Sequence, residues 1–237
     1  MGNEPVKEKS VQSKIGSYIS SLLRDHFGKG PTSVYVTIKK PYVIVHVRGF
    51  LAPTEKILVK QKQSRRVLET RDLLMEDLKQ AIKLELWKIA NLDVKQIFTD
   101  WNLENKTGVF IALLEQEEGD EHFDWPENID MEAFKSEAID ASQKAQKKPE
   151  NINVSWLNDR SILIARSGLF VEIEKELIKN GFIEELRLAK RPLETRLIKQ
   201  SNLESILQQN IHEVFVDWDF QNDKGYMVLI LAKNKNE

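Results

Sequence analysis

The sequence contains an internal repeat, which is clearest in two segments that align without a gap. Residues 98–108 and 215–225 share Phe, Asp, Trp, Asn and Gly at matching positions. An apolar stretch follows each segment, at 109–114 and at 226–231. Self-similarity in this form is typical of a chain built from copies of one structural unit. The sequence therefore predicts a tandem duplication of one small domain.

Further matches occur in the same order along both copies. The motif Leu-Glu-Thr-Arg stands at 68–71 and again at 193–196. Strand-like positions of copy one also have apparent partners in copy two: Val34, Val36 and Ile38 with Ile152, Val154 and Trp156, then Ile44, Val45 and Arg48 with Ile162, Leu163 and Arg166. On this alignment copy two is longer before its Leu-Glu-Thr-Arg motif and shorter after it, in regions expected to be helical.

Hydrophobic periodicity predicts the elements of each copy. In copy one these are a helix over 8–27, strands at 33–38 and 42–50, helices over 54–63 and 65–90, and strands at 94–102 and 107–115. Copy two begins with a helix over 131–146. The order α-β-β-α-α-β-β predicts an α+β fold, in which each copy is an antiparallel four-stranded sheet with helices on one face.

The predicted domain boundary lies in an acidic connector that contains Gly119 and Pro126. We therefore expect repeat 1 over 1–120, a linker over about 117–128 and repeat 2 over 128–237. Sheets with one open face usually pair, so a pseudo-twofold arrangement of the two repeats is expected.

Composition excludes several classes of function. The chain has no cysteine, which rules out disulfides, thiol catalysis and cysteine-based zinc sites. A formal net charge of −2 argues against a chain held to nucleic acid by bulk electrostatics, so no nucleic-acid partner is expected. The N-terminus lacks a signal-peptide pattern, and the longest apolar runs are far shorter than the ~20 residues of a spanning helix. We expect a soluble, cytoplasmic protein without a transmembrane segment.

No motif in the sequence indicates catalysis. The four histidines are isolated from one another, so neither a metal site nor a cofactor is expected. The stretch 28–33, Gly-Lys-Gly-Pro-Thr-Ser, lies between a predicted helix and a predicted strand, which is the reverse of a phosphate-binding loop. The sequence therefore predicts a protein that is not an enzyme and has no catalytic residues.

Basic residues gather in matching places in the two copies. The candidates for anion or partner binding are Arg48, Arg65, Arg66, Arg71, Arg166 and Arg196. Arg71 and Arg196 end the two Leu-Glu-Thr-Arg motifs, and a guanidinium can clamp a carboxylate through two parallel hydrogen bonds. A solvated helix face with i,i+4 pairs, or an internal pair with Glu69 or Glu194, explains them equally well.

Two tryptophans, Trp101 and Trp218, follow the repeated aspartates and are candidate surface or interface residues. In a strand, neighbouring side chains face opposite sides, so one member of each Asp-Trp pair is expected to be buried. The alternative to an aromatic binding surface is that both indoles fill the core or the contact between repeats.

Copy one resembles the MpsC-like domain family. The resemblance is carried by Gly-Pro-Thr-Ser-Val at 30–34, by the stretch 45–56 with its Leu-Ala-Pro-Thr-Glu, by Arg65 with 67–71, and by the hairpin over 94–114. It covers about residues 8–116. Copy two departs from the pattern, with Lys148-Pro149 and Leu-Phe-Val-Glu at 169–172, so roles of Pro53 and Glu55 are not carried over to it.

The resemblance implies an accessory or regulatory protein of a bacterial membrane-potential-generating system that serves bicarbonate uptake. Its expected partner is a membrane transport subunit or a second copy of itself, which places it at the inner face of the membrane. The alternative function is a small-anion or nucleotide sensor, with Arg48, Arg71 and their counterparts around a cleft between the repeats.

Overall fold

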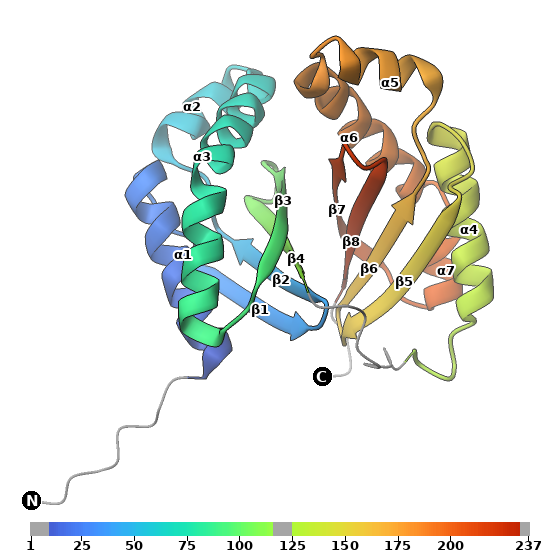
Figure 1. Ribbon diagram of the computed structural model, residues 1–237, viewed down its shortest axis with the longest axis horizontal. Helices are drawn as coiled ribbons and strands as arrows, with labels where there is room; N and C mark the ends of the chain where they lie inside the picture. The colour runs from blue at the N-terminus through green and yellow to red at the C-terminus, as the bar shows by residue number, and fades with distance from the viewer. Residues whose placement is uncertain (1–9, 116–124, 233–237) are drawn as a thin grey trace, which may run out of the picture. The chain divides into compact units, whose positions relative to one another are not determined.

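A computed structural model describes residues 10–115 and 125–232, and the chain divides into two compact units with one sheet each (Figure 1). The first unit contains α1 (Val11–Phe27), β1 (Ser33–Lys39), β2 (Tyr42–Arg48), α2 (Pro53–Lys60), α3 (Ser64–Ala90), β3 (Val94–Asn102) and β4 (Thr107–Leu114). The second contains α4 (Met131–Ala145), β5 (Asn151–Asn158), β6 (Ser161–Ser167), α5 (Glu172–Lys179), α6 (Ile183–Lys199), α7 (Leu203–Leu207), β7 (Ile211–Asp219) and β8 (Lys224–Leu231). The α+β prediction is confirmed. Most of the predicted linker lies outside the described residues.

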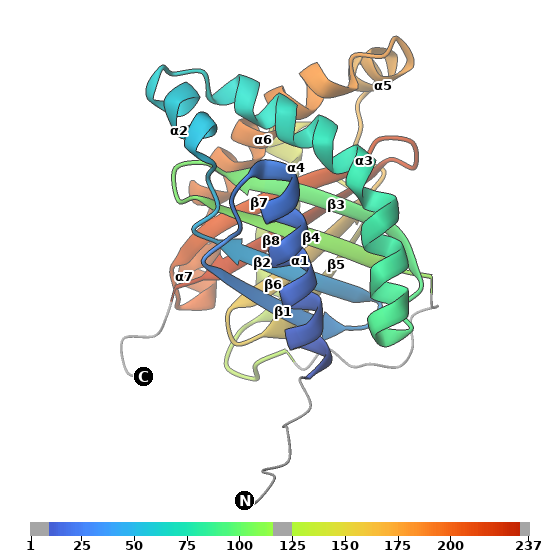
Figure 2. The same ribbon diagram turned by 90° about the vertical axis from the view of Figure 1, so that its left-hand side faces the viewer.

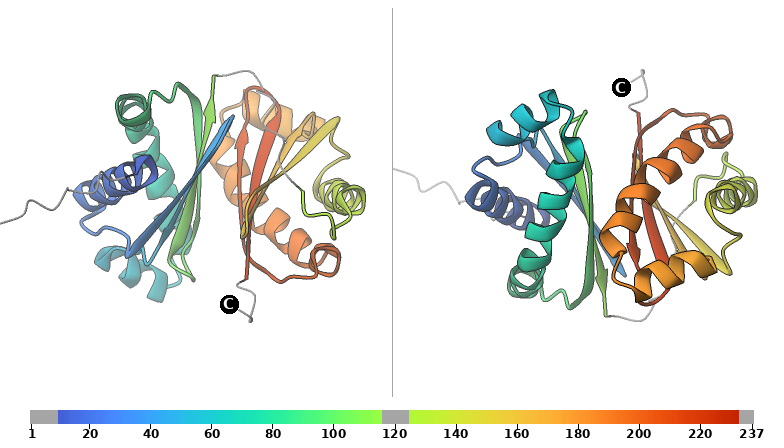
Figure 3. Two further views of the ribbon diagram at one scale, coloured as in Figure 1. Left: turned by 90° about the horizontal axis from the view of Figure 1, so that it is seen from below. Right: turned by 90° about the horizontal axis from the view of Figure 1, so that it is seen from above.

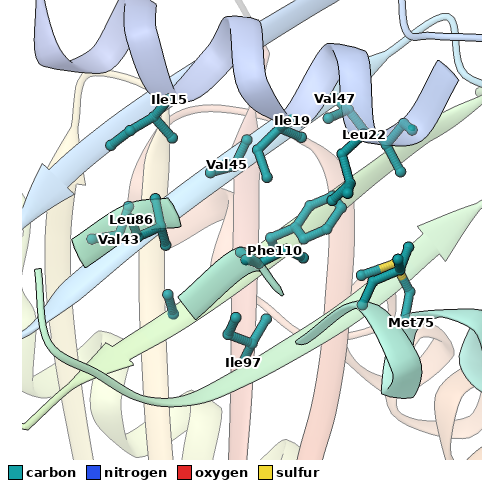
Figure 4. Packing of buried hydrophobic residues seen from close by; sticks show 14 of the residues in the cluster. Ile15, Ile19, Leu22, Val43, Val45, Val47, Met75, Leu86, Ile97 and Phe110 are labelled. Carbon is teal, nitrogen blue, oxygen red and sulfur yellow. The ribbon is translucent and has the colours of Figure 1, made fainter. Parts of the chain in front are cut away.

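The first unit is an antiparallel sheet in the order β1-β2-β4-β3, and α1 and α3 lie across one of its faces (Figure 2). Helix α1 begins at the N-cap Ser10, whose hydroxyl accepts from the Ser13 amide, and ends at Gly28 in the left-handed conformation. Ile15 and Ile19 of α1 point toward the sheet, where the core also holds Val45 and Phe110 (Figure 4). Burial of this apolar stripe is what fixes the helices on the sheet.

The second unit repeats this topology, with the strand order β5-β6-β8-β7 and with α4 and α6 on one face of its sheet (Figure 3). It differs in one element from the predicted order. The counterpart of the long helix α3 is divided, since α6 ends at Lys199 and the short helix α7 follows. At the break, the Ser201 hydroxyl donates to the Ile198 carbonyl and the Asn202 amide donates to Glu137, so side chains satisfy backbone groups there.

Strand pairing corrects the predicted match between Arg48 and Arg166. In the first sheet Val47 lies opposite Gly108, and in the second Arg166 lies opposite Gly225. Because Gly108 and Gly225 are matched in the repeat, the counterpart of Arg166 is Val47. The match of Arg48 with Arg166 was wrong by one residue, and such a shift moves a side chain to the other face of a sheet.

Helix positions correct the second predicted match, that of Arg71 with Arg196. Helices α3 and α6 follow the N-caps Gln63 and Phe182. Counting from these caps, Arg71 corresponds to Lys190. The two Leu-Glu-Thr-Arg motifs therefore do not stand at equivalent positions of the two helices. With the alignment corrected, copy two no longer has extra residues before its motif.

A Gly49→Ala substitution is expected to lower the free energy of unfolding more than Gly28→Ala does. Both glycines have positive φ, 67° and 71°, where a side chain costs roughly 1 kcal/mol. A Cβ at Gly49 would also overlap the Thr32 side chain, whereas one at Gly28 meets nothing. Urea unfolding of both variants measures the difference, and equal losses would contradict the overlap.

Candidate functional site

A buried arginine ties helices α2 and α3 together in the first unit. Arg71 is 0% exposed, and its Nε and Nη2 donate to Oε1 and Oε2 of Glu55 at 2.8 and 2.7 Å. Nη2 also donates to the Phe50 carbonyl at 3.2 Å. The guanidinium lies 4.5 Å from the Phe50 ring centroid and 4.6 Å from that of Trp101. Two-point pairing and two aromatic faces together stabilise a charge that is removed from water.

Glu55 has a second structural role, because it caps the helix on which it lies. Its Oε2 accepts from the Ala52 amide at 2.7 Å, which satisfies a backbone donor at the start of α2. One carboxylate thus fixes the first turn of α2 and the first half of α3. Nε and Nη2 of Arg71 are bonded within its own unit, whereas Nη1 is buried without a hydrogen-bond partner among the described residues. Because the guanidinium is 0% exposed, this arginine adds no support to the small-anion sensor.

The second unit contains the same arrangement with a lysine. Lys190 Nζ donates to Glu174 Oε1 at 2.6 Å, and Glu174 Oε2 accepts from the Val171 amide at 3.0 Å. Lys190 lies 5.1 Å from the Phe170 ring centroid and 5.3 Å from that of Trp218. Glu174 is therefore the counterpart of Glu55. The sequence alignment did not carry the role of Glu55 over to copy two, because it was displaced by one residue; the structure places Glu174 in that role.

An additional buried ion pair distinguishes the second unit. Arg166 Nη2 donates to Glu194 Oε2 at 2.6 Å, and both side chains are 2% exposed. Arg166 Nη1 donates to Ser142, and Trp218 Nε1 donates to Glu194 Oε1 at 3.2 Å. In the first unit, the strand register places Val47 at the position of Arg166, and counting from the helix N-caps places Met75 at the position of Glu194. Both Val47 and Met75 belong to the apolar core of that unit (Figure 4).

The remaining candidate residues do not share one site. Arg48 is half-buried at the end of β2, whereas Arg65, Arg66 and Arg196 are exposed on helices. Arg65 donates to Glu69 at 2.7 Å, which is an i,i+4 pair of the kind expected for a solvated helix face.

The two tryptophans are not surface residues. Trp101 is 6% exposed and Trp218 is 2% exposed, and each belongs to the hydrophobic core cluster of its own unit. The expectation of an aromatic binding surface is therefore corrected in favour of core packing. The physical reason is that each indole forms one wall of a buried cation site.

The exposed feature that the Arg71–Glu55 pair positions is a strongly basic corner. We define the basic corner as Lys56, Lys60, Lys62, Arg65 and Arg66, all of them exposed at the junction of α2 and α3. Residues 53–66 contain these five cations and one carboxylate, that of Glu55, so the segment has a net charge of +4. Ile57 lies among them with 57% of its surface exposed.

Most cations of the basic corner have no counter-charge. Lys56, Lys60, Lys62 and Arg66 form no ion pair with any residue in the described part of the chain, and only Arg65 is paired. A cluster of like charges without local neutralisation produces a positive electrostatic potential at the surface. The sequence shows these cations as a run, but the exposure of the whole run follows only from the fold.

The equivalent corner of the second unit has the opposite net charge. Over 172–185 it holds two cations and five carboxylates, for a net charge of −3. Its lysines are paired, Lys175 with Glu172 at 2.8 Å and Lys179 with Glu176 at 3.6 Å. The hydrogen bond from Lys175 lowers the pKa of Glu172 and raises the pKa of Lys175 itself.

Comparison with known proteins identifies the family. The sequence profile described as "Na+-translocating membrane potential-generating system (MpsC)" matches residues 7–116. The chain is also 31% identical over 100 residues to "Uncharacterized protein YbcI" of Bacillus subtilis, an alignment that covers 42% of this chain and 79% of that protein. The chain belongs to the MpsC family. No solved structure matches it significantly.

The profile match covers the first unit, including the Arg71–Glu55 pair and the basic corner. In the part of the chain that the structure describes, no helix is long and apolar enough to cross a membrane. Among the same residues, no group of three or more His, Asp or Glu side chains is arranged to hold a metal ion.

Proposed function

We propose that this chain is a non-enzymatic accessory or regulatory component of a membrane-potential-generating system that serves bicarbonate uptake. It acts at the cytoplasmic face of the membrane, next to a transport subunit. The observation that carries the proposal is the MpsC family match over residues 7–116, which ends with the first unit.

The geometry of the first unit supports a docking role. The Phe50 carbonyl, the Glu55 carboxylate and the side chain of Arg71 hold α2 against α3 from inside. These internal bonds fix the backbone of the two helices that carry the basic corner. A surface held in place before binding loses little conformational entropy on association.

The second unit has a different role in the proposed function. Its corner has the opposite net charge, and its lysines are engaged with neighbouring glutamates. We propose that only the first unit docks and that the second unit has a structural or regulatory part. Duplication followed by charge inversion separates the two tasks within one chain.

Deletion of the gene is expected to lower the uptake of labelled bicarbonate, and a plasmid copy is expected to restore it. A plasmid carrying Lys56→Gln, Lys60→Gln, Lys62→Gln and Arg66→Gln is expected to restore uptake poorly. The matched control carries Lys144→Gln, Lys175→Gln, Lys179→Gln and Lys199→Gln, which remove the same charge from exposed positions of the second unit.

Membrane potential is recorded with a voltage-sensitive dye in the same cells. Uptake and potential that are unchanged by deletion, in cells that express the membrane subunit, would overturn the proposal.

A further inference from the structure

The basic corner is an exposed turn between two helices. It is formed where α2 ends at Lys60 and α3 begins at Ser64, and the connecting residues 61–63 are all exposed. It suits a broad partner whose negative charge is spread over a surface.

The chemistry of the corner favours diffuse attraction. Three of its four unpaired cations are lysines, which are point charges on flexible stems and lack the planar fork of arginine. No acidic residue occurs from 56 to 68, so no local carboxylate competes for them. Each basic residue near an anionic lipid surface increases the affinity about fivefold.

An exposed apolar side chain lies in the same segment as these cations. Ile57 is one turn from Lys60 and adjacent to Lys56, and more than half of its surface is in contact with solvent. At a lipid interface, basic residues stay among the headgroups while a neighbouring apolar side chain enters the acyl boundary. A purely electrostatic contact with an acidic protein gives no role to this isoleucine.

We infer that the basic corner binds the anionic headgroup layer of a membrane, with Ile57 inserted below the lysines. The inference rests on the proposed function and deepens it, by naming the partner chemistry of the same surface. It is the first unit that lies on the membrane, because the equivalent corner of the second unit would be repelled by anionic lipid.

The test is flotation of the full chain with vesicles. Binding is expected to vesicles of phosphatidylglycerol and phosphatidylcholine in equal parts, to be absent with phosphatidylcholine alone, and to weaken as salt rises from about 0.15 M to about 1 M. The variant with Lys56→Gln, Lys60→Gln, Lys62→Gln and Arg66→Gln is expected to bind about 600-fold more weakly, because it loses four basic residues that contribute about fivefold each.

The control variant with Lys144→Gln, Lys175→Gln, Lys179→Gln and Lys199→Gln carries the same net charge and is expected to bind as the parent does. Ile57→Ser is expected to weaken binding while leaving its salt dependence unchanged. Circular dichroism establishes that each variant is folded.

The inference would be overturned by equal losses in both quadruple variants, by equal binding to neutral vesicles, or by a lack of binding to anionic vesicles, with or without binding to polyglutamate. Normal bicarbonate uptake by a chain that binds no vesicles would overturn this inference alone. Vesicle binding by a chain whose deletion leaves uptake unchanged would overturn the proposed function alone.

Discussion

Arg71→Met is expected to lower the free energy of unfolding of the first unit by about 3–5 kcal/mol, because it removes one partner of a buried ion pair. Glu55 would keep its charge in a largely buried place, and its two bonds to the guanidinium would be lost. The aromatic rings of Phe50 and Trp101 would also lose the cation between them. Urea unfolding followed by tryptophan fluorescence measures the change, and amide hydrogen exchange assigns it to one unit.

Two controls separate the buried pair from charge alone. Arg65→Met removes an exposed arginine whose side chain is 67% exposed, and is expected to change stability by less than about 1 kcal/mol. Arg71→Lys is expected to be milder than Arg71→Met, because Lys190 holds the equivalent place in the second unit. Equal effects of Arg71→Met and Arg65→Met would contradict the structural role of the pair.

Glu194→Met is expected to destabilise the second unit by about 3–5 kcal/mol, and adding Arg166→Val is expected to restore most of this loss. The single change leaves Arg166 buried and without its carboxylate. The double change recreates the apolar pair Val47 and Met75, which packs in the core of the first unit. Buried ion pairs can be replaced by apolar residues of similar volume with little change in stability.

A double-mutant cycle measures the coupling, which is expected to be at least about 3 kcal/mol, because each single change leaves a buried charge and the double change leaves none. Restoration is not complete, because Trp218 Nε1 loses its acceptor, Glu194 Oε1, and an unsatisfied buried donor costs about 1–3 kcal/mol. Glu185→Met, at an exposed position, is the control for adding a methionine to α6. Strictly additive losses of the two single changes would show that the pair is not replaceable in this way.

The sequence by itself determined the elements of the fold and their order. Alternating apolar residues gave the two hairpins of the first unit, and the three-and-four spacing of Ile15 and Ile19 gave helix α1, because each period follows directly from backbone geometry. The gapless repeat gave the duplication. The sequence also predicted the charge of the basic corner, because its five cations lie within residues 56–66 and no acidic residue lies between them.

Only the tertiary structure decided which side chains are partners. Glu55 lies sixteen positions before Arg71 and was not among its expected partners, because sequence spacing identifies only neighbours on the same helix. Matching identical residues also aligned the strands of the two repeats incorrectly by one position. In a strand that is apolar throughout, a one-residue shift cannot be detected from sequence until the strand pairing is known. The burial of Trp101 and Trp218 likewise depends on which elements cover them. Long-range contacts are set by packing in three dimensions, and local sequence patterns do not encode them.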